Sequence, residues 1–200
     1  SNNNNNILPL SSSSKQPVIV VCNSNVTHST ADGGEYPIRV AQCKTAESVL
    51  LSGVGKSSLR DATLQDVNEC KDQLDPIVYK RARHVVTENS RVQAAKIAFE
   101  SGDWKQMGSL MNASHTSMKE DYEVSCEEID ILVELAQTHP GVYGSRLTGG
   151  GFGGCTVTLV DPNEVDNLIA HMTHKYTIAT GKSCFAFQTS PQAGARSLIV

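Results

Sequence analysis

Apolar residues recur at every third or fourth position in several long segments of the chain, and this spacing predicts helices. Gly102 ends one of them, and Pro162 stands where a first helical residue is expected. Ser125 and Glu128 have the spacing of a capping box, in which each side chain satisfies a backbone amide of the first turn. The predicted helices cover 37–51, 76–101, 104–118, a segment from Ser125 through Ala136, and 162–176.

Shorter runs of apolar and β-branched residues predict strands at 18–22, before and after the glycines at 149–154, and near 184–187 and 197–200. Helices come first, then a hairpin, another helix and further strands. This order is typical of an α+β domain with two layers, in which helices pack on an antiparallel sheet.

Five glycines occupy six positions between the two strands of the predicted hairpin, from Gly149 to Gly154. Glycine costs entropy on folding, so such a cluster favours positive φ angles or close approach of backbone to a ligand, often a phosphate. A glycine-rich turn without a ligand is the alternative. A dinucleotide site is not expected, because the pattern after the glycines predicts a strand and not a helix. The segment 53–58 lacks the first glycine of a P-loop and is interpreted as a helix that ends in a glycine cap.

Composition narrows the function classes. The chain has 39% hydrophobic residues and a formal net charge of -4, which is typical of a globular domain and argues against a nucleic-acid surface. No apolar run reaches the roughly 18 residues of a membrane span, and no signal peptide is recognisable, so we expect a cytoplasmic protein with no membrane partner. The six cysteines form no Cys-x-x-Cys pair and are interpreted as buried thiols.

Several polar clusters offer chemistry, but the simpler interpretation is preferred for each. His171 and His174 share a helix face without an acidic partner, so we expect solvated histidines and no metal site. Ser114, His115 and Asp121 contain the residue types of a hydrolase triad without a nucleophile elbow. Asp121 and Glu123 lack the remainder of a metal loop. The basic run 80–84, followed by Glu88, is interpreted as a solvated helix face.

Residues 1–16, which contain runs of Asn and Ser, have too little apolar content to repay ordering and predict a disordered segment. The remaining chain resembles the GHMP family of sugar and metabolite kinases, and within it the galactokinase family. The resemblance is carried by four groups of residues in matching order: 23–28 with 35–37, 81–86, Ser114-His115 with 121–126, and the glycine segment 144–157.

The resemblance implies a GHMP kinase C-terminal domain of ferredoxin-like α+β fold at 37–200, preceded at 17–36 by the last strand region of the N-terminal domain. It implies a monomeric enzyme with ATP and galactose as partners, which phosphorylates galactose to galactose 1-phosphate with Mg²⁺. Tyr36 matches the tyrosine that contacts the sugar. Gly149, Gly150, Gly151, Phe152, Gly153 and Gly154 match the loop that supports the phosphate-binding loop.

The family's serine-rich phosphate loop, its catalytic aspartate and an arginine near the transferred phosphoryl group lie in the N-terminal half, and these 200 residues contain none of them. The resemblance therefore implies that this chain is the C-terminal part, that it supplies no catalytic residue or metal ligand, and that ATP and Mg²⁺ bind mainly elsewhere. We expect the chain alone to be inactive. A galactose- and ATP-binding sensor without activity is the alternative function, and a stand-alone structural or interaction domain is a third.

Overall fold

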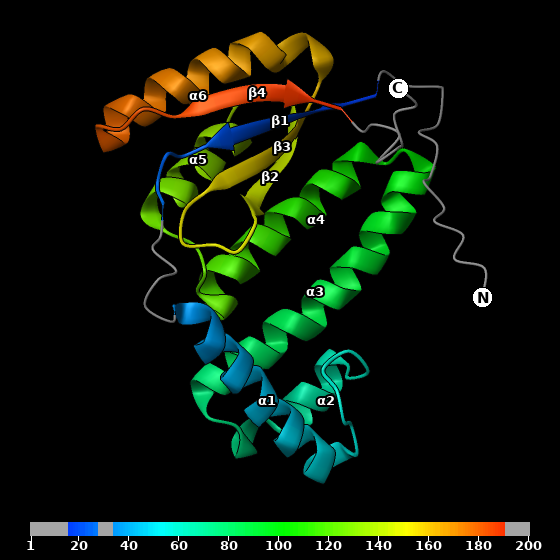
Figure 1. The fold of residues 1–200 in the computed structure, drawn as a ribbon. Coiled ribbons are helices and arrows are strands. Elements are labelled where there is room, and N and C mark those ends of the chain that lie inside the picture. Colours follow the sequence, from blue (N-terminus) through cyan, green and yellow to red (C-terminus); the bar gives the residue numbers. More distant parts are fainter. Residues whose placement is uncertain (1–15, 28–33, 191–200) are drawn as a thin grey trace, which may run out of the picture.

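The computed structural model describes residues 16–27 and 34–190. The sheet, with α5 and α6, forms one end of the molecule, and α1 and α2 lie at the other (Figure 1). The elements in chain order are β1 (Val18–Asn23), α1 (Glu35–Val54), α2 (Leu64–Glu69), η1 (Lys71–Gln73), α3 (Pro76–Ser101), α4 (Trp104–Ser117), η2 (Met118–Tyr122), α5 (Glu127–Gln137), β2 (Val142–Thr148), β3 (Cys155–Val160), η3 (Pro162–Glu164), α6 (Val165–Thr180) and β4 (Phe185–Thr189).

The four strands form one antiparallel sheet in the order β2-β3-β1-β4. Val20 of β1 stands opposite Thr158 on one side and Gln188 on the other. Because successive side chains alternate between faces, Val20 and Cys22 point into the core while their neighbours are only half-buried. The predicted two-layer α+β architecture is confirmed.

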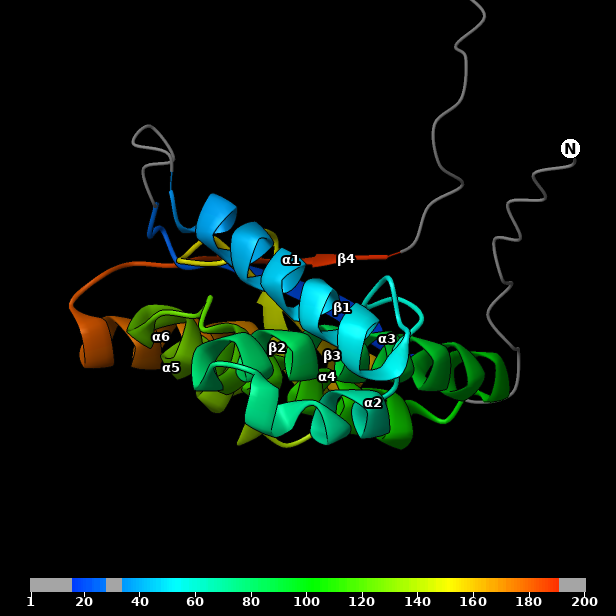
Figure 2. The same ribbon diagram turned by 90° about the horizontal axis from the view of Figure 1, so that it is seen from below.

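The helices α5 and α6 cover one face of the sheet, as Figure 2 shows from below. Their apolar stripes meet Val20 and Cys22 in a core that includes Leu132, Leu168 and Met172, each fully buried. The Tyr176 side chain is also buried, and its hydroxyl donates to the backbone oxygen of Ser24 over 2.8 Å. This bond ties the end of β1 to α6.

A second core lies between α1, α2 and α3 and includes Ala46, Leu50, Val67 and Val86. The helix α3 has the predicted bounds: the Asp75 side chain caps its first turn, and Gly102 ends it in the left-handed conformation. Gly55 ends α1 in the same way, which confirms the glycine cap expected there.

The helix α4 joins the two ends of the molecule by packing directly on β2. Gly108 of α4 lies against the backbone of Tyr143 and Gly144, so close that a Cβ on Gly108 would overlap the Tyr143 carbonyl oxygen. Two glycines therefore allow helix and strand to approach without intervening side chains.

Some sequence predictions need correction. The capping box at Ser125 is wrong, because Cys126 precedes α5 without a side-chain cap, and the Ser125 hydroxyl donates to Asp130 Oδ1 over 2.6 Å instead. The Glu128 carboxylate pairs with Lys182. The disordered segment predicted at 1–16 falls, except for residue 16, outside the described residues, as does the strand at 197–200. The proposed domain boundary at residue 36 stays a prediction; β1, which precedes it, shares its sheet with β3 and β4.

Candidate functional site

The glycine loop, residues 149–154, connects β2 to β3 and is anchored at both of its ends. The Phe152 amide donates to the Val124 oxygen over 2.7 Å, and the Gly154 amide donates to the Val26 oxygen over 3.0 Å. The amide and the hydroxyl of Ser24 both donate to the Gly154 oxygen, over 2.9 and 2.8 Å. The loop is therefore held against the segments after β1 and before α5.

The glycines of the loop meet two different requirements. Gly151 (φ +90°) and Gly153 (φ +134°) face the chain's own backbone, where a Cβ would overlap the oxygens of Val124 and Val26 respectively. At Gly149, Gly150 and Gly154, no atom lies within 4 Å of the position that a Cβ would take. Gly149 (φ +90°) and Gly154 (φ +79°) are also in the left-handed region, so the turn itself explains four of the five glycines. Only Gly150 has no positive φ, and its open backbone is available to a ligand.

The structure brings Tyr36 and the glycine loop together, although they are more than a hundred positions apart in the sequence. Tyr36 lies in the first turn of α1 and is 74% exposed. It lines a hollow of about 700 Å³ with Gly150, Gly151, Phe152 and Gly154. One side of this hollow is thus an aromatic ring with a hydroxyl, and the other is largely backbone.

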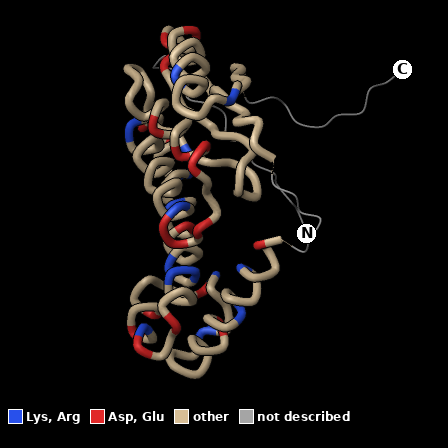
Figure 3. The backbone as a smooth tube through the Cα atoms, turned by 90° about the vertical axis from the view of Figure 1, so that its left-hand side faces the viewer, with Lys and Arg blue, Asp and Glu red and all other residues tan. Residues whose placement is uncertain are grey.

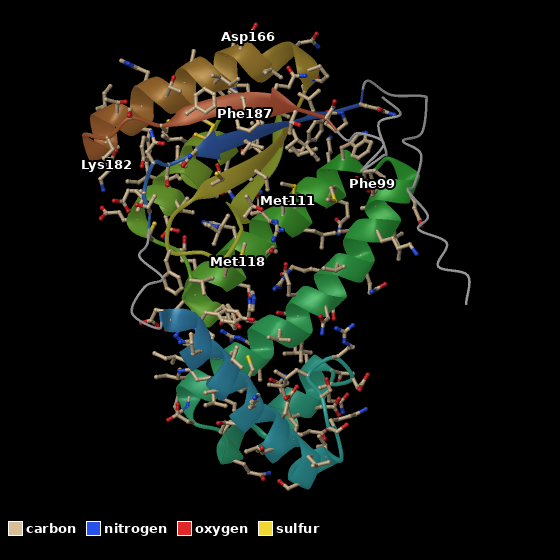
Figure 4. The ribbon with its side chains drawn as sticks, in the orientation of Figure 1. Phe99, Met111, Met118, Asp166, Lys182 and Phe187 are labelled. Atoms are coloured by element: carbon tan, nitrogen blue, oxygen red, sulfur yellow. The ribbon has the colours of Figure 1, made fainter. Side chains whose placement is uncertain are left out.

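A smaller cavity of about 240 Å³ lies beside Tyr36 and is lined by Arg39, His84, Tyr122 and Phe152, among others. Met118, the first residue of η2, also lines this cavity and lies beneath the glycine loop in the view of Figure 4. The two cavities share Tyr36, Gly150 and Phe152. The hollow therefore rests on a layer of aromatic and basic side chains.

The basic run 80–84 is not a solvated helix face, and that interpretation is corrected. Arg81 is 2% exposed and donates to the Gln42 side chain, the Asp121 backbone oxygen and the Glu123 carboxylate. Arg83 pairs with the Asp121 carboxylate. Helix α3 packs against both α1 and η2, so its basic residues meet acidic residues in and directly after η2.

His84 is buried in the same network. Its ring stacks on Tyr122 at 4.4 Å between centroids, and its Nδ1 lies 3.0 Å from the Ser117 hydroxyl. The single proton of the Ser117 hydroxyl is donated to Asp121 Oδ2. In the bond between His84 and Ser117, the His84 Nδ1 must therefore be the donor. Burial lowers the pKa of His84 to about 4, so the ring is neutral at pH 7.

His115 and Asp121 do not form a triad with Ser114. The Ser114 hydroxyl donates to Glu88, whereas His115 Nδ1 accepts from the Leu147 amide and its Nε2 lies 3.3 Å from Asp130. Burial opposes ionisation of Asp130, but hydrogen bonds from His115, Ser125 and Lys119 outweigh it and lower the pKa to about 2. His115 therefore fixes the end of β2, immediately before the glycine loop. Sequence reasoning missed Asp130, which no motif distinguishes from a surface residue.

Within residues 16–27 and 34–190, no group of three His, Cys, Asp or Glu side chains could hold a metal ion. His174 is exposed, as expected, whereas His171 is half-buried and lies 5.3 Å from His139 between ring centroids. Of the cysteines, Cys22 and Cys70 are buried and the other four are half-buried thiols.

Basic and acidic residues are interspersed along the helices, as Figure 3 shows. None of the helices described here combines the length and the apolar character that a bilayer crossing requires.

Comparison with known proteins finds similarity to one family of kinases. Residues 95–178 match the family model described as GHMP kinases C terminal. The galactokinase of Homo sapiens is 46% identical over 158 residues, which are 79% of this chain and 39% of the relative. The galactokinase of Bos taurus is 45% identical with the same coverage, and that of Chloroflexus aggregans is 47% identical over 166 residues, or 82% of this chain and 42% of the relative. The chain thus spans about two fifths of the length of these relatives.

Two solved structures have a similar fold. The crystal structure of Lactococcus lactis galactokinase complexed with galactose superposes with a TM-score of 0.83 at 34% identity, covering 86% of this chain and 45% of that one. The mevalonate kinase of L. major, in complex with R-mevalonate, shares the fold with a TM-score of 0.54 at 23% identity, covering 90% of this chain and 44% of that one.

Proposed function

We propose that this chain forms the Tyr36 and glycine-loop side of a galactokinase active site. The premise is that it carries a GHMP kinase C-terminal domain homologous to that of galactokinases. The proposed reaction transfers the terminal phosphoryl group of ATP to the anomeric hydroxyl of galactose and yields galactose 1-phosphate. The activity is proposed for a complete enzyme and not for these 200 residues alone.

One observation carries the proposal: Tyr36 and the open backbone of Gly150 line the same hollow. A tyrosine offers a ring face to a pyranose and a hydroxyl to a sugar oxygen. The Tyr36 hydroxyl makes no hydrogen bond with another described residue, and its high exposure leaves it available to a ligand. The related Lactococcus lactis enzyme was crystallised with galactose, which supports a sugar as the ligand.

The glycine loop suits a role beside a phosphate chain. Backbone amides without overlying side chains can approach phosphate oxygens closely, and Gly150 has open space where a Cβ would stand. Phosphoryl transfer depends mainly on positioning and on charge stabilisation, so a domain can contribute without supplying a base. ATP, with its Mg²⁺, would bring the phosphoryl group to the mouth of the hollow. We assign Mg²⁺ no ligand within the described residues.

No catalytic base is assigned in this chain. Glu35 lines the hollow, but its carboxylate accepts a hydrogen bond from Arg39 over 3.0 Å. Asp121 and Glu123 are engaged by arginines in the network behind the hollow. The base is therefore proposed to lie outside these residues, as in the family that the chain resembles.

The test compares two proteins: the 200-residue chain, and the product of the complete reading frame that contains it. Each is incubated with galactose, ATP and Mg²⁺, and galactose 1-phosphate is measured. We expect no product from the chain alone and turnover of about one per second or faster from a complete kinase.

Turnover by the 200-residue chain would contradict the assignment of the base to another segment. Binding of galactose and ATP by the complete protein without turnover would instead support a sensor. Failure of the complete protein to bind galactose would refute the proposed function.

A further inference from the structure

Arg39 lies one helical turn after Tyr36 in α1, on the side that faces the turn η2 and the glycine loop. It is 6% exposed, which is unusual for an arginine. No sequence motif distinguishes it, since the resemblance that identifies Tyr36 rests on the Glu35-Tyr36-Pro37 string alone. Its burial therefore calls for an explanation from its contacts.

The Arg39 guanidinium makes three hydrogen bonds in three directions. Its Nε donates to the Tyr122 backbone oxygen over 2.7 Å, and its Nη2 donates to the Glu123 backbone oxygen over 2.9 Å. Its Nη1 donates to the Glu35 carboxylate, which lies in the same turn of α1 as Tyr36. Glu123 is in the left-handed conformation (φ +55°), which turns its carbonyl group toward the arginine.

Arg39 binds the carbonyl groups of the two residues that come immediately before Val124 in the sequence. The Val124 oxygen in turn accepts a hydrogen bond from the Phe152 amide of the glycine loop. The guanidinium carbon also lies 5.9 Å from the centre of the Phe152 ring. One buried side chain thus contacts the helix turn that carries Tyr36, the segment that anchors the loop, and the loop itself.

Among the described residues, no side chain caps the start of α1. Its N-cap is Gly34, which offers no side-chain hydrogen bond. The body of α1 is held elsewhere, by Ala46 and Leu50 packing against α3 and by the bond between Gln42 and Arg81. Loss of the Arg39 contacts should therefore loosen the first turn and the loop while the body of the helix stays packed.

We propose that Arg39 is a positioning residue that holds the Tyr36 turn and the glycine loop in fixed relation, so that the two sides of the hollow form one site. Lysine cannot replace it, because a single ammonium group cannot satisfy three acceptors in the plane of a guanidinium. The positioning rests on this chain's own contacts; only the identity of the positioned ligand, galactose, rests on the proposed function.

The first experiment needs no activity. Amide hydrogen exchange is measured residue by residue in the 200-residue chain and in its Arg39→Lys variant. Arg91→Lys is the matched control, because Arg91 is also mostly buried but pairs with Glu88 on α3, away from the hollow. We expect the Phe152 and Val124 amides to exchange about tenfold faster or more in Arg39→Lys only. The Leu50 and Leu159 amides should keep their rates in both variants.

Unchanged exchange at Phe152 and Val124 would overturn the proposal. Equal acceleration at all four amides would also overturn it, because that result would indicate a general loss of stability.

The second experiment uses the complete protein and measures the Michaelis constants for galactose and ATP. Arg39→Lys should raise the galactose KM about tenfold, with the ATP KM within about twofold of the unaltered protein. An unchanged galactose KM would contradict the positioning of Tyr36. If the unaltered protein itself shows no turnover, the proposed function fails while the exchange experiment still decides the role of Arg39.

Discussion

Replacement of Gly151 by valine tests whether the glycine loop needs this residue for its own folding. The structure places Gly151 at φ +90°, with the Val124 backbone directly beside it. A Cβ there would overlap the Val124 oxygen and lie 2.8 Å from the Val124 Cβ. Gly150 is the matched control, because the same valine there meets open space and Gly150 has no positive φ.

The cost of Gly151→Val can be worked from two effects. A side chain held at positive φ costs about 1 to 3 kcal/mol, with β-branched residues at the upper end. Displacement of the Val124 carbonyl would also break its bond to the Phe152 amide, for about 1 kcal/mol. The sum is about 3 kcal/mol or more. For a chain of this size, about 2 to 4 °C per kcal/mol converts this to a loss of about 6 to 12 °C in Tm.

Thermal unfolding of the 200-residue chain, followed by circular dichroism, measures both variants. Gly150→Val should change Tm by no more than about 2 °C. In the complete protein it should still lower turnover, because the new side chain blocks the backbone that faces the hollow. Equal Tm values for Gly151→Val and the unaltered chain would refute the reasoning, as would a Gly150→Val variant that unfolds as early as Gly151→Val.

Three further changes test other parts of the structure. Tyr36→Ala should lower kcat/KM for galactose in the complete protein, with a loss of about 1 to 3 kcal/mol of transition-state stabilisation and little change in kcat/KM for ATP. An unchanged kcat/KM for galactose would remove Tyr36 from the site. His84 has a folded pKa of about 4, below its unfolded value of 6.5, so its neutral form stabilises the fold at neutral pH. This contribution to the free energy of unfolding, about 3 kcal/mol, is lost as the pH falls from 6.5 to about 4. Urea unfolding should show that His84→Gln loses less stability over that pH range than the unaltered chain does. Gly108→Ala should cost about 3 kcal/mol or more, because its Cβ would overlap the Tyr143 carbonyl group, and a Tm equal to that of the unaltered chain would contradict this packing.

The glycine-rich segment shows where sequence reasoning is sufficient and where it is not. Five glycines between two strand-like runs predict a hairpin loop that needs positive φ or open backbone. The sequence cannot tell which glycine meets which need, because the distinction depends on what lies beside each Cβ position. Val124 and Val26 lie beside Gly151 and Gly153 only after the chain has folded, and Gly150 stays open.

The helices α1, α3 and α6, the strand β3 and the glycine caps of Gly55 and Gly102 follow from local signals, namely periodicity, capping and the freedom of glycine. Local signals carry no information on what a helix packs against. The basic run of α3 therefore has the pattern of a solvated face, yet Arg81 and His84 are buried because η2 brings acidic residues and Tyr122 against them. The burial of Arg39 is not visible in the sequence for the same reason: two of its three acceptors, the Tyr122 and Glu123 backbone oxygens, lie on a segment that only tertiary packing brings to α1.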